Sequence, residues 1–246
     1  MKKYGLVGYP LGHSFSRSFF QQKFENEQID ATYENFEMAD VSNLRQLIAN
    51  TPELCGLNVT IPHKSAIIPL LDQLDPQARE IGAVNVIKIE RQGERLFLKG
   101  FNSDIIGFTH SIAPLLDSHM TKALILGTGG ASKAICAGLK SLNIAPTFVS
   151  RQKHGDVLGY DELTPEVMAS HPVIVNTTPV GMYPHTDECP AIPYDCLTPR
   201  HLCYDVVYNP EETLFLQKAA QKGCKTKNGI EMLHLQAIAA WDIWNQ

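Results

Sequence analysis

The sequence has no apolar run long enough to cross a bilayer, and its first residues lack the apolar core of a signal peptide. We therefore expect no membrane association and a cytoplasmic location. Positive charge is also in short supply, because 21 lysines and arginines stand against 26 aspartates and glutamates, with no basic cluster. Nucleic acid is not expected as a partner, since proteins that bind it need concentrated positive charge.

Cysteine is sparse, and its spacing excludes the common metal and redox motifs. The six cysteines contain no Cys-x-x-Cys pair, and the seven-residue spacing of Cys189, Cys196 and Cys203 is not that of zinc ligands. We expect no metal site and reduced thiols. What remains is an ordinary globular composition, 44% hydrophobic and 19% charged, in a chain of 246 residues that can form one large or two small domains.

Segments with the period of a strand alternate along the chain with segments that have the period of a helix. This alternation predicts an α/β fold with a parallel, doubly wound sheet and right-handed crossovers. Strands are expected at residues 5–8, 32–36, 57–61, 83–89, 95–100, 122–126, 147–149, 172–176 and 202–207. Helices are expected from Ser14 or Ser16 past Phe24 and at residues 41–49, 64–71, 105–116, 131–142 and 231–244.

A second strand–helix rhythm begins near residue 105 and indicates a second domain. We place one boundary at residues 104–105 and another at residues 228–229, with the last helix packing back on the first domain. The predicted domains are therefore residues 1–104 plus 229–246 and residues 105–228.

Residues 57–64 have the sequence Leu-Asn-Val-Thr-Ile-Pro-His-Lys, in which apolar and polar side chains alternate as in a strand. Pro62 cannot donate to a ladder, so the strand is expected to end there and to deliver Lys64 at the edge of the sheet. A polar strand face beside a lysine favours a pocket for a small polyhydroxylated molecule. The alternative is a solvated lysine that opens the next helix, which is the commoner role of a lone lysine.

Residues 123–134, ALILGTGGASKA, have the pattern of a strand, a glycine turn and a helix. Gly127 permits the tight turn, Gly129 lets the backbone approach a pyrophosphate, and the helix N-terminus attracts negative charge. Ser132 stands in place of the third glycine of the usual Gly-x-Gly-x-x-Gly pattern. The turn consists of Gly127, Thr128, Gly129, Gly130 and Ala131.

The following strand ends in Ser150-Arg151-Gln152-Lys153. An NAD site carries a carboxylate at this position to bind the ribose 2′-hydroxyl. Here Arg151 and Lys153 place positive charge where a 2′-phosphate would lie, and Ser150 adds a hydroxyl donor. We therefore predict NADP(H) in preference to NAD(H). The alternative is an exposed loop arginine without a role in binding.

Eight segments occur in one order along nearly the whole chain. They are GYPLGHSFS (8–16), NVTIPHK (58–64), GAVN (82–85), NSDIIG (102–107), GTGGA (127–131), NTTPVGM (176–182), YDVVYNP (204–210) and NGIEML (228–233), the last followed by Gln236. Together these segments resemble the shikimate dehydrogenase family. A match of eight motifs in sequence is far more specific than any one of them.

The resemblance implies reversible reduction of 3-dehydroshikimate to shikimate by NADPH, a step in chorismate and aromatic amino acid biosynthesis. It also implies that residues 1–104 plus 229–246 form an α/β substrate-binding and catalytic domain, and that residues 105–228 form a Rossmann-like NADP-binding domain. Lys64 and Asp104 match the family's catalytic pair. The positions that match substrate ligands are Ser14, Ser16, Asn58, Thr60, Asn85, Tyr208 and Gln236. The positions that match cofactor contacts are Gly127 to Ala131, Ser150, Arg151, Lys153, Val206 and Gly229, with Met232 beside the nicotinamide.

The expected chemistry agrees with these two residue types. Hydride addition to a ketone leaves an alkoxide, which needs a proton and a nearby positive charge. Lys64 can donate that proton, and in the oxidative direction it can accept the hydroxyl proton. Asp104 is expected to orient Lys64 and to bind the neighbouring hydroxyl, although it also suits the N-cap of the following helix. How the two groups share the proton stays open, because coupled groups titrate as a pair.

Two other functions compete with this one. A quinate or shikimate dehydrogenase of broader substrate and NAD/NADP use has the same scaffold, as does a non-catalytic sensor that binds NADP. The presence of both Lys64 and Asp104 counts against the sensor. We expect a small-molecule substrate and a monomer or homodimer.

Overall fold

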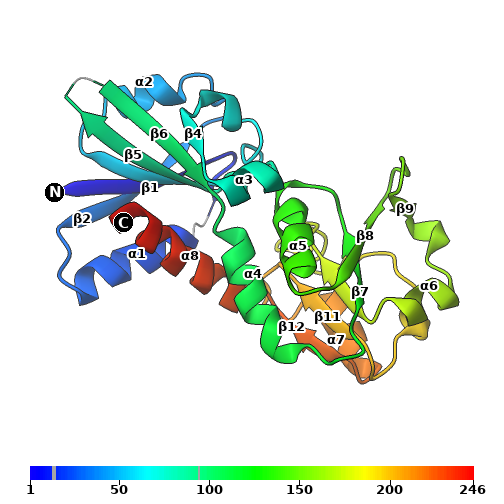
Figure 1. The fold of residues 1–246 in the computed structure, drawn as a ribbon. Helices are drawn as coiled ribbons and strands as arrows, with labels where there is room; N and C mark the ends of the chain where they lie inside the picture. The colour runs from blue at the N-terminus through cyan, green and yellow to red at the C-terminus, as the bar shows by residue number, and fades with distance from the viewer. Residues whose placement is uncertain (13–14, 94) are drawn as a thin grey trace. The chain divides into compact units, whose positions relative to one another are not determined.

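The computed structural model describes residues 1–12, 15–93 and 95–246. The chain divides into two units, residues 1–103 with 237–246 and residues 104–236, each built around its own six-stranded sheet (Figure 1). The division falls within the last helix, α8 (Ile230–Asn245). The predicted α/β class is confirmed.

The first unit contains a mixed sheet with the strand order β2-β1-β3-β5-β6-β4. Strands β1, β2 and β3 are parallel, whereas β5 runs antiparallel to both β3 and β6. The strands are β1 (Lys2–Gly8), β2 (Ala31–Glu37), β3 (Leu54–Val59), β4 (Gln73–Leu74), β5 (Val86–Gln92) and β6 (Arg95–Phe101). The helices are α1 (Phe15–Asn26), α2 (Leu44–Ala49) and α3 (Pro76–Ile81), with a 3₁₀ turn at Ile68–Leu70.

Alternation along the strands divides the apolar side chains of the first unit between two faces of the sheet. Leu57 and Val59 of β3 pack on one face with residues of α2 and α3. Tyr4 of β1 packs on the other face with aromatic residues of α1 and α8, among them Trp244, whose indole N–H donates to the Ile87 carbonyl at 3.1 Å. Asn58, between Leu57 and Val59, consequently lies on the α1 and α8 face.

The second unit contains an all-parallel sheet with the order β12-β11-β10-β7-β8-β9. The strands are β7 (Lys122–Leu126), β8 (Ala145–Ser150), β9 (Leu158–Gly159), β10 (Val173–Asn176), β11 (Leu202–Asp205) and β12 (Lys225–Lys227). This is the order of a doubly wound dinucleotide-binding sheet, in which the direction of winding reverses between β7 and β10. Ligands of such sheets bind at this reversal, outside the carboxyl ends of the strands.

Helices cover both faces of the second sheet. They are α4 (Asp104–Ile112), α5 (Gly130–Ser141), α6 (Pro165–Ser170), α7 (Leu214–Gln221) and the first part of α8. Ile125 and Val175 pack with residues of α4, α5 and α8, whereas Leu124 and Ile174 pack with residues of α6 and α7. The parallel strands are thus buried on both faces, which is why their sequences are continuous apolar runs.

The structure corrects several predicted boundaries. The strand expected at residues 57–61 occupies Leu54–Val59, and Ile61 is 68% exposed. The helix expected at residues 64–71 is only the 3₁₀ turn Ile68–Leu70, because Pro69 within it cannot donate a backbone hydrogen bond. Likewise α4 ends at Ile112, two residues before Pro114. The sequence prediction did not include α3, α6, α7 or β12. No helix within the described residues is long and apolar enough to cross a membrane.

Candidate functional site

Side chains from α1, β2 and β3 form a hydrogen-bonded group in the first unit, together with the segment just before β5. The Tyr33 hydroxyl donates to Asn58 Oδ1 at 2.7 Å, and Tyr33 is also hydrogen-bonded to the side chain of Ser16. The amide nitrogen of Asn58 donates to the Asn85 carbonyl at 3.4 Å. The structure therefore brings together three predicted substrate ligands and adds Tyr33, whereas Ser14 lies outside the described residues.

Asn85 is buried, and its side chain fixes the segment that leads to Asp104. Its Oδ1 accepts from the Ser103 backbone N–H at 2.7 Å, and its Nδ2 donates to Ser103 Oγ at 3.0 Å. Asn102 adds a hydrogen bond from Nδ2 to the Ala83 carbonyl at 2.9 Å. This buried network therefore fixes the backbone directly before Asp104.

Lys64 lies in the turn after β3, and backbone hydrogen bonds fix its position. The Val84 N–H donates to the Lys64 carbonyl at 2.7 Å, and the His63 N–H donates to the Thr60 carbonyl at 2.9 Å. Thr60 and Lys64 are both partly buried. The His63 ring is buried, with Nε2 at 2.6 Å from the Met38 carbonyl, which gives it a structural role.

In the second unit, the glycine turn lies where the winding of the sheet reverses. Gly127 has φ = +105°, and a side chain there would press against Thr177 and Thr178, with 2.9 Å to each. Gly129 is the N-cap of α5, and within the described residues no atom other than those of its chain neighbours lies within 4 Å of where its Cβ would be. The Ser132 hydroxyl donates to the Gly129 carbonyl at 2.6 Å, so this serine fits inside the turn in place of the third glycine. The turn thus presents a helix N-terminus with open space before it, which suits a phosphate.

A buried carboxylate connects the strand ends on one side of this turn. Asp205 ends β11 and accepts hydrogen bonds from Asn176 Nδ2 at 3.0 Å, the Val207 N–H at 3.0 Å and the Thr213 hydroxyl at 2.6 Å. Burial raises the pKa of Asp205 to about 6, while the three hydrogen bonds oppose the rise. The donors all face the carboxylate, so this group holds the ends of β10 and β11 together.

The loop after β10 is attached to the same network. Asn176 Oδ1 accepts from the Thr178 N–H at 3.1 Å and from its hydroxyl at 2.7 Å, while the Thr177 hydroxyl donates to the Leu126 carbonyl at 2.6 Å. The Gly229 N–H donates to the Val207 carbonyl at 3.1 Å, and a side chain at Gly229 would collide with the Val206 backbone. Val206 and Gly229, two predicted cofactor contacts, therefore lie side by side.

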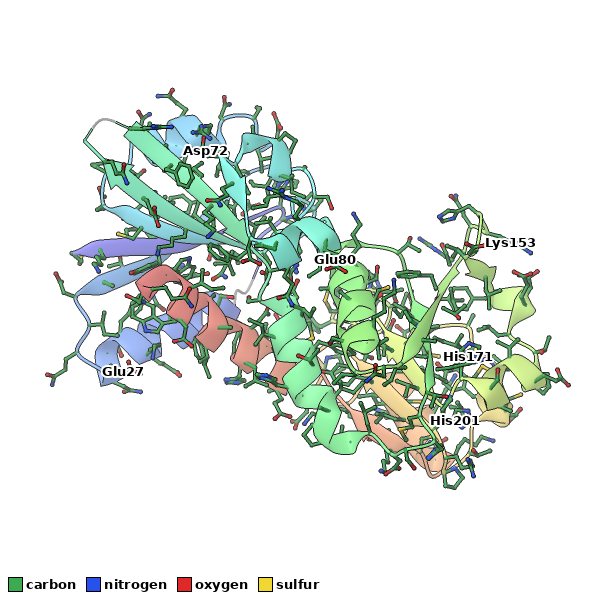
Figure 2. The ribbon with its side chains drawn as sticks, viewed as in Figure 1. Glu27, Asp72, Glu80, Lys153, His171 and His201 are labelled. Carbon is green, nitrogen blue, oxygen red and sulfur yellow. The ribbon has the colours of Figure 1, made fainter. Side chains whose placement is uncertain are left out.

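The loop after β8 carries the predicted 2′-phosphate contacts. Ser150 ends β8, and its hydroxyl accepts from the Gln152 N–H at 3.3 Å. Arg151 is exposed. Lys153, labelled in Figure 2, donates to Glu162 Oε1 at 2.5 Å. The sequence predicted the positive charge of Lys153 but not its acidic partner.

The other predicted site residues of the second unit lie on α4, α8 and the loop after β11. Asp104 is the first residue of α4 and is buried. Met232 and Gln236 lie on α8, which crosses α4 at Gly107. A Cβ atom added to Gly107 would lie only 3.1 Å from the backbone nitrogen of Gln236. Tyr208 follows β11, and burial raises the pKa of its hydroxyl.

Sequence reasoning missed four residues that organise these groups: Tyr33, Glu162, Asn176 and Asp205. Asn176 and Asp205 had a signal, since each is a polar residue that ends a buried strand. Glu162 had none, because its partner is nine residues away in an irregular loop. Within the described residues, no group of three or more His, Cys, Asp or Glu side chains could hold a metal ion.

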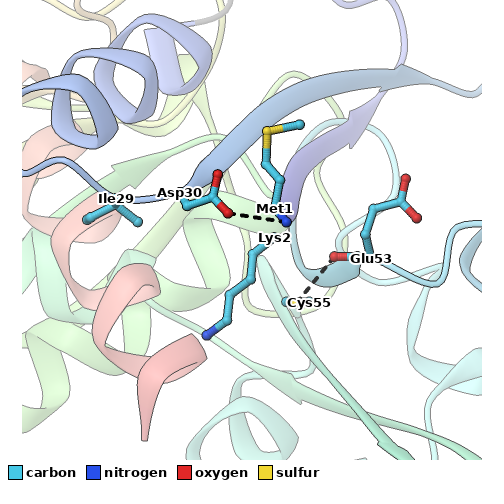
Figure 3. Close-up of a pocket in the computed structure, with 6 residues that line it drawn as sticks. All are labelled: Met1, Lys2, Ile29, Asp30, Glu53 and Cys55. Atoms are coloured by element: carbon cyan, nitrogen blue, oxygen red, sulfur yellow. Dashed lines mark hydrogen bonds and ion pairs between the residues drawn. The ribbon is translucent and has the colours of Figure 1, made fainter.

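Two hollows in the first unit lie away from the carboxyl edge of its parallel strands. One, of about 410 Å³, is lined by residues at the amino ends of β1, β2 and β3, where the Met1 ammonium pairs with Asp30 at 3.3 Å and the Cys55 thiol donates to the Glu53 carbonyl (Figure 3). The other, of about 200 Å³, lies by the β5–β6 hairpin. Neither is lined by a predicted site residue, so neither is the candidate site.

Comparison with known proteins points to one family. Residues 6–87 match the family model described as "Shikimate dehydrogenase substrate binding domain". The chain is 34% identical to the shikimate dehydrogenase (NADP(+)) of Desulforamulus reducens, across 98% of this chain and 88% of that protein. It is similar to the structure of shikimate dehydrogenase 1 from Peptoclostridium difficile, with a TM-score of 0.86, 36% identity, and coverage of 100% of this chain and 92% of that one. It is also similar to the shikimate 5-dehydrogenase of Thermus thermophilus in complex with NADP(H) and shikimate, with a TM-score of 0.86, 27% identity, and coverage of 99% and 93%.

Proposed function

Because the chain belongs to the shikimate dehydrogenase family, we propose that it catalyses the reversible reduction of 3-dehydroshikimate to shikimate with NADPH. The observation that carries the proposal is the similarity to an NADP-dependent shikimate dehydrogenase over 98% of the chain. The enzyme is accordingly an oxidoreductase that acts on a CH–OH group, in aromatic amino acid biosynthesis. The cytoplasmic location and the monomeric or homodimeric state remain predictions.

The residues of the second unit fit NADP(H). Open space before Gly129 and the N-terminus of α5 suit the pyrophosphate, while Arg151 and the Ser150 hydroxyl suit the 2′-phosphate. Val206 and Gly229 are proposed as further cofactor contacts, and Met232 is proposed to lie beside the nicotinamide. When bound, the cofactor supplies or accepts the hydride.

The residues of the first unit are proposed to hold the substrate. Ser14 and Ser16 are proposed to bind the substrate carboxylate, Thr60 and Asn85 are proposed to bind its ring hydroxyls, and Asn58 is proposed to line the same pocket. Gln236 is proposed as a further ligand of the ring hydroxyls, and Tyr208 as a further contact of the substrate. Tyr33 orients Asn58 through its 2.7 Å hydrogen bond.

Lys64 is proposed to move the proton. During reduction it donates to the carbonyl oxygen of 3-dehydroshikimate as negative charge develops there, and its ammonium stabilises that charge. During oxidation it accepts the hydroxyl proton of shikimate. Asp104 is proposed to orient Lys64 and to bind the neighbouring hydroxyl.

The test follows the absorbance of reduced cofactor with shikimate or quinate and with NADP⁺ or NAD⁺, for the wild type and for Lys64→Ala. We expect activity with shikimate and NADP⁺, and we expect Lys64→Ala to abolish it while shikimate binding, measured by calorimetry, changes little. A wild type that binds NADPH but oxidises neither substrate would contradict the proposal and favour the sensor. Equal rates with quinate or NAD⁺ would favour the broader dehydrogenase.

A further inference from the structure

Glu162 fixes the position of the Lys153 ammonium through two hydrogen bonds. Its Oε1 accepts from Lys153 Nζ at 2.5 Å, and its Oε2 accepts from the Gly159 backbone N–H at 2.8 Å. The Glu162 side chain is 31% exposed, whereas that of Lys153 is 61% exposed. The carboxylate is therefore the more buried partner of the pair, and a second hydrogen bond anchors it to the backbone.

Strand pairing places this carboxylate beside the predicted 2′-phosphate site. Ser150 at the end of β8 is opposite Gly159 in β9, the residue whose N–H holds Glu162. The neighbouring Tyr160 faces the charge of Arg151, which lowers the pKa of the Tyr160 hydroxyl against the larger rise caused by burial. The 3₁₀ turn Tyr160–Glu162 thus supports the loop that carries Ser150, Arg151 and Lys153.

The charges in this loop have consequences for anion binding. Lys153 and the Gly159 amide both lower the pKa of the Glu162 carboxyl, so Glu162 is ionised at neutral pH. An ionised Glu162 neutralises Lys153 and repels a phosphate dianion at the same place. NAD(H) has a hydroxyl there and does not meet this repulsion.

Resting on the proposed function, we propose that Glu162 is a specificity-determining residue that holds Lys153 in an ion pair and thereby weakens the preference for NADP(H) over NAD(H). Arg151 then supplies most of the attraction for the 2′-phosphate. Lys153 contributes its full charge to that attraction only when Glu162 is removed.

The test measures binding of adenosine 2′,5′-bisphosphate and of adenosine 5′-monophosphate by calorimetry, without catalysis. Glu162→Gln keeps an oxygen for the Gly159 N–H but loses the charge. We expect it to bind the bisphosphate about fivefold more tightly, since exposed ion pairs and single like charges have effects of this order, with no change for the monophosphate. The KM for NADP⁺ should fall by a similar factor, and the KM for NAD⁺ should stay the same.

Two further variants distinguish an effect of the charges in this loop from an effect of the protein's net charge. Asp195→Asn removes the acidic partner of another exposed lysine, Lys222 at 2.7 Å, and should leave both affinities unchanged. Lys153→Gln should weaken bisphosphate binding less in the wild type than in Glu162→Gln, where it should remove the whole gain.

Unchanged or weaker bisphosphate binding by Glu162→Gln would overturn the inference, as would an equal gain in Asp195→Asn. These outcomes leave the proposed function intact, because wild-type oxidation of shikimate with NADP⁺ tests it separately. A wild type with the same affinity for the bisphosphate and the monophosphate would overturn both the NADP assignment and the inference.

Discussion

At the scale of single residues, the second unit depends on a carboxylate with no exposure to water. Asp205 receives three hydrogen bonds and joins the ends of β10 and β11 to the start of α7. All of its partners are donors, so the ionised form is fully satisfied even though burial disfavours it. Asp205 thereby fixes the ends of these two strands.

The raised pKa of Asp205 predicts a pH-dependent contribution to stability. The pKa is about 6 in the folded protein against an ordinary value of 3.8, so between these values the folded state holds a proton that the unfolded state has lost. The contribution of Asp205 to the free energy of unfolding therefore falls as pH rises through this interval, by about 3 kcal/mol in total. Urea unfolding of the wild type and Asp205→Asn at about pH 4 and pH 7 measures it. A constant difference between the two proteins would contradict the prediction.

Arg151 carries a second prediction at this scale. Arg151→Gln removes a charge-assisted partner of the 2′-phosphate and should raise the KM for NADP⁺ by about 10- to 100-fold, the range expected for hydrogen bonds to charged groups. The KM for NAD⁺ should change little. Steady-state kinetics with both cofactors measures the effect, and an equal increase for both would mean that the arginine acts on the loop instead of on the phosphate.

At the scale of elements, the crossing of α4 and α8 depends on the absence of a side chain at Gly107. A Cβ there would press against the Met232 carbonyl and the Gln236 backbone, so the helices meet backbone to backbone. The same crossing positions Met232 and Gln236, two proposed site residues. The crossing of α4 and α8 therefore stabilises the fold and also supports the proposed site.

Gly107→Ala should push these helices apart. We expect a loss of about 1–3 kcal/mol in the free energy of unfolding, the usual cost of overpacking, and a higher KM for shikimate. Ala134, on α5 of the same unit, offers a comparison, since Ala134→Gly removes a methyl group and should affect stability without altering KM. Equal kinetic effects in the two variants would argue against a link between the crossing and the site.

At the scale of the whole molecule, each unit has its own cores on the two faces of its own sheet. Trp241 and Trp244 both belong to the first unit, so tryptophan fluorescence reports on that unit, whereas far-UV circular dichroism reports on both. Separate cores predict separate unfolding transitions.

We therefore expect the urea transitions detected by fluorescence and by circular dichroism not to coincide. Adenosine 2′,5′-bisphosphate at 100 times its Kd should stabilise the second unit by about 2.7 kcal/mol and move the circular dichroism transition more than the fluorescence transition. Coincident transitions that move together would show that the units unfold as one.

Local sequence was sufficient for some features of the fold and site. The glycine turn at Gly127 and the strands on either side of it follow from residues adjacent in the chain, as does the β5–β6 hairpin. The helix predicted at residues 64–71 was wrong because Pro69 outweighs the apolar pattern around it. Predicted boundaries are wrong where one residue, such as a proline, controls the backbone. The presence of a whole helix or strand is easier to predict because its pattern extends over many residues.

By itself the sequence determined the α/β class, the glycine turn and, through eight ordered motifs, the resemblance that the relatives confirm. Only the tertiary structure decided the strand order that puts the turn where the winding reverses, the burial of Asp205 among three donors, and the pairing of Lys153 with Glu162. Local conformation depends on neighbouring side chains, which a sequence displays directly. Charge pairing depends on which distant segments the sheet brings together, and no local pattern carries that information.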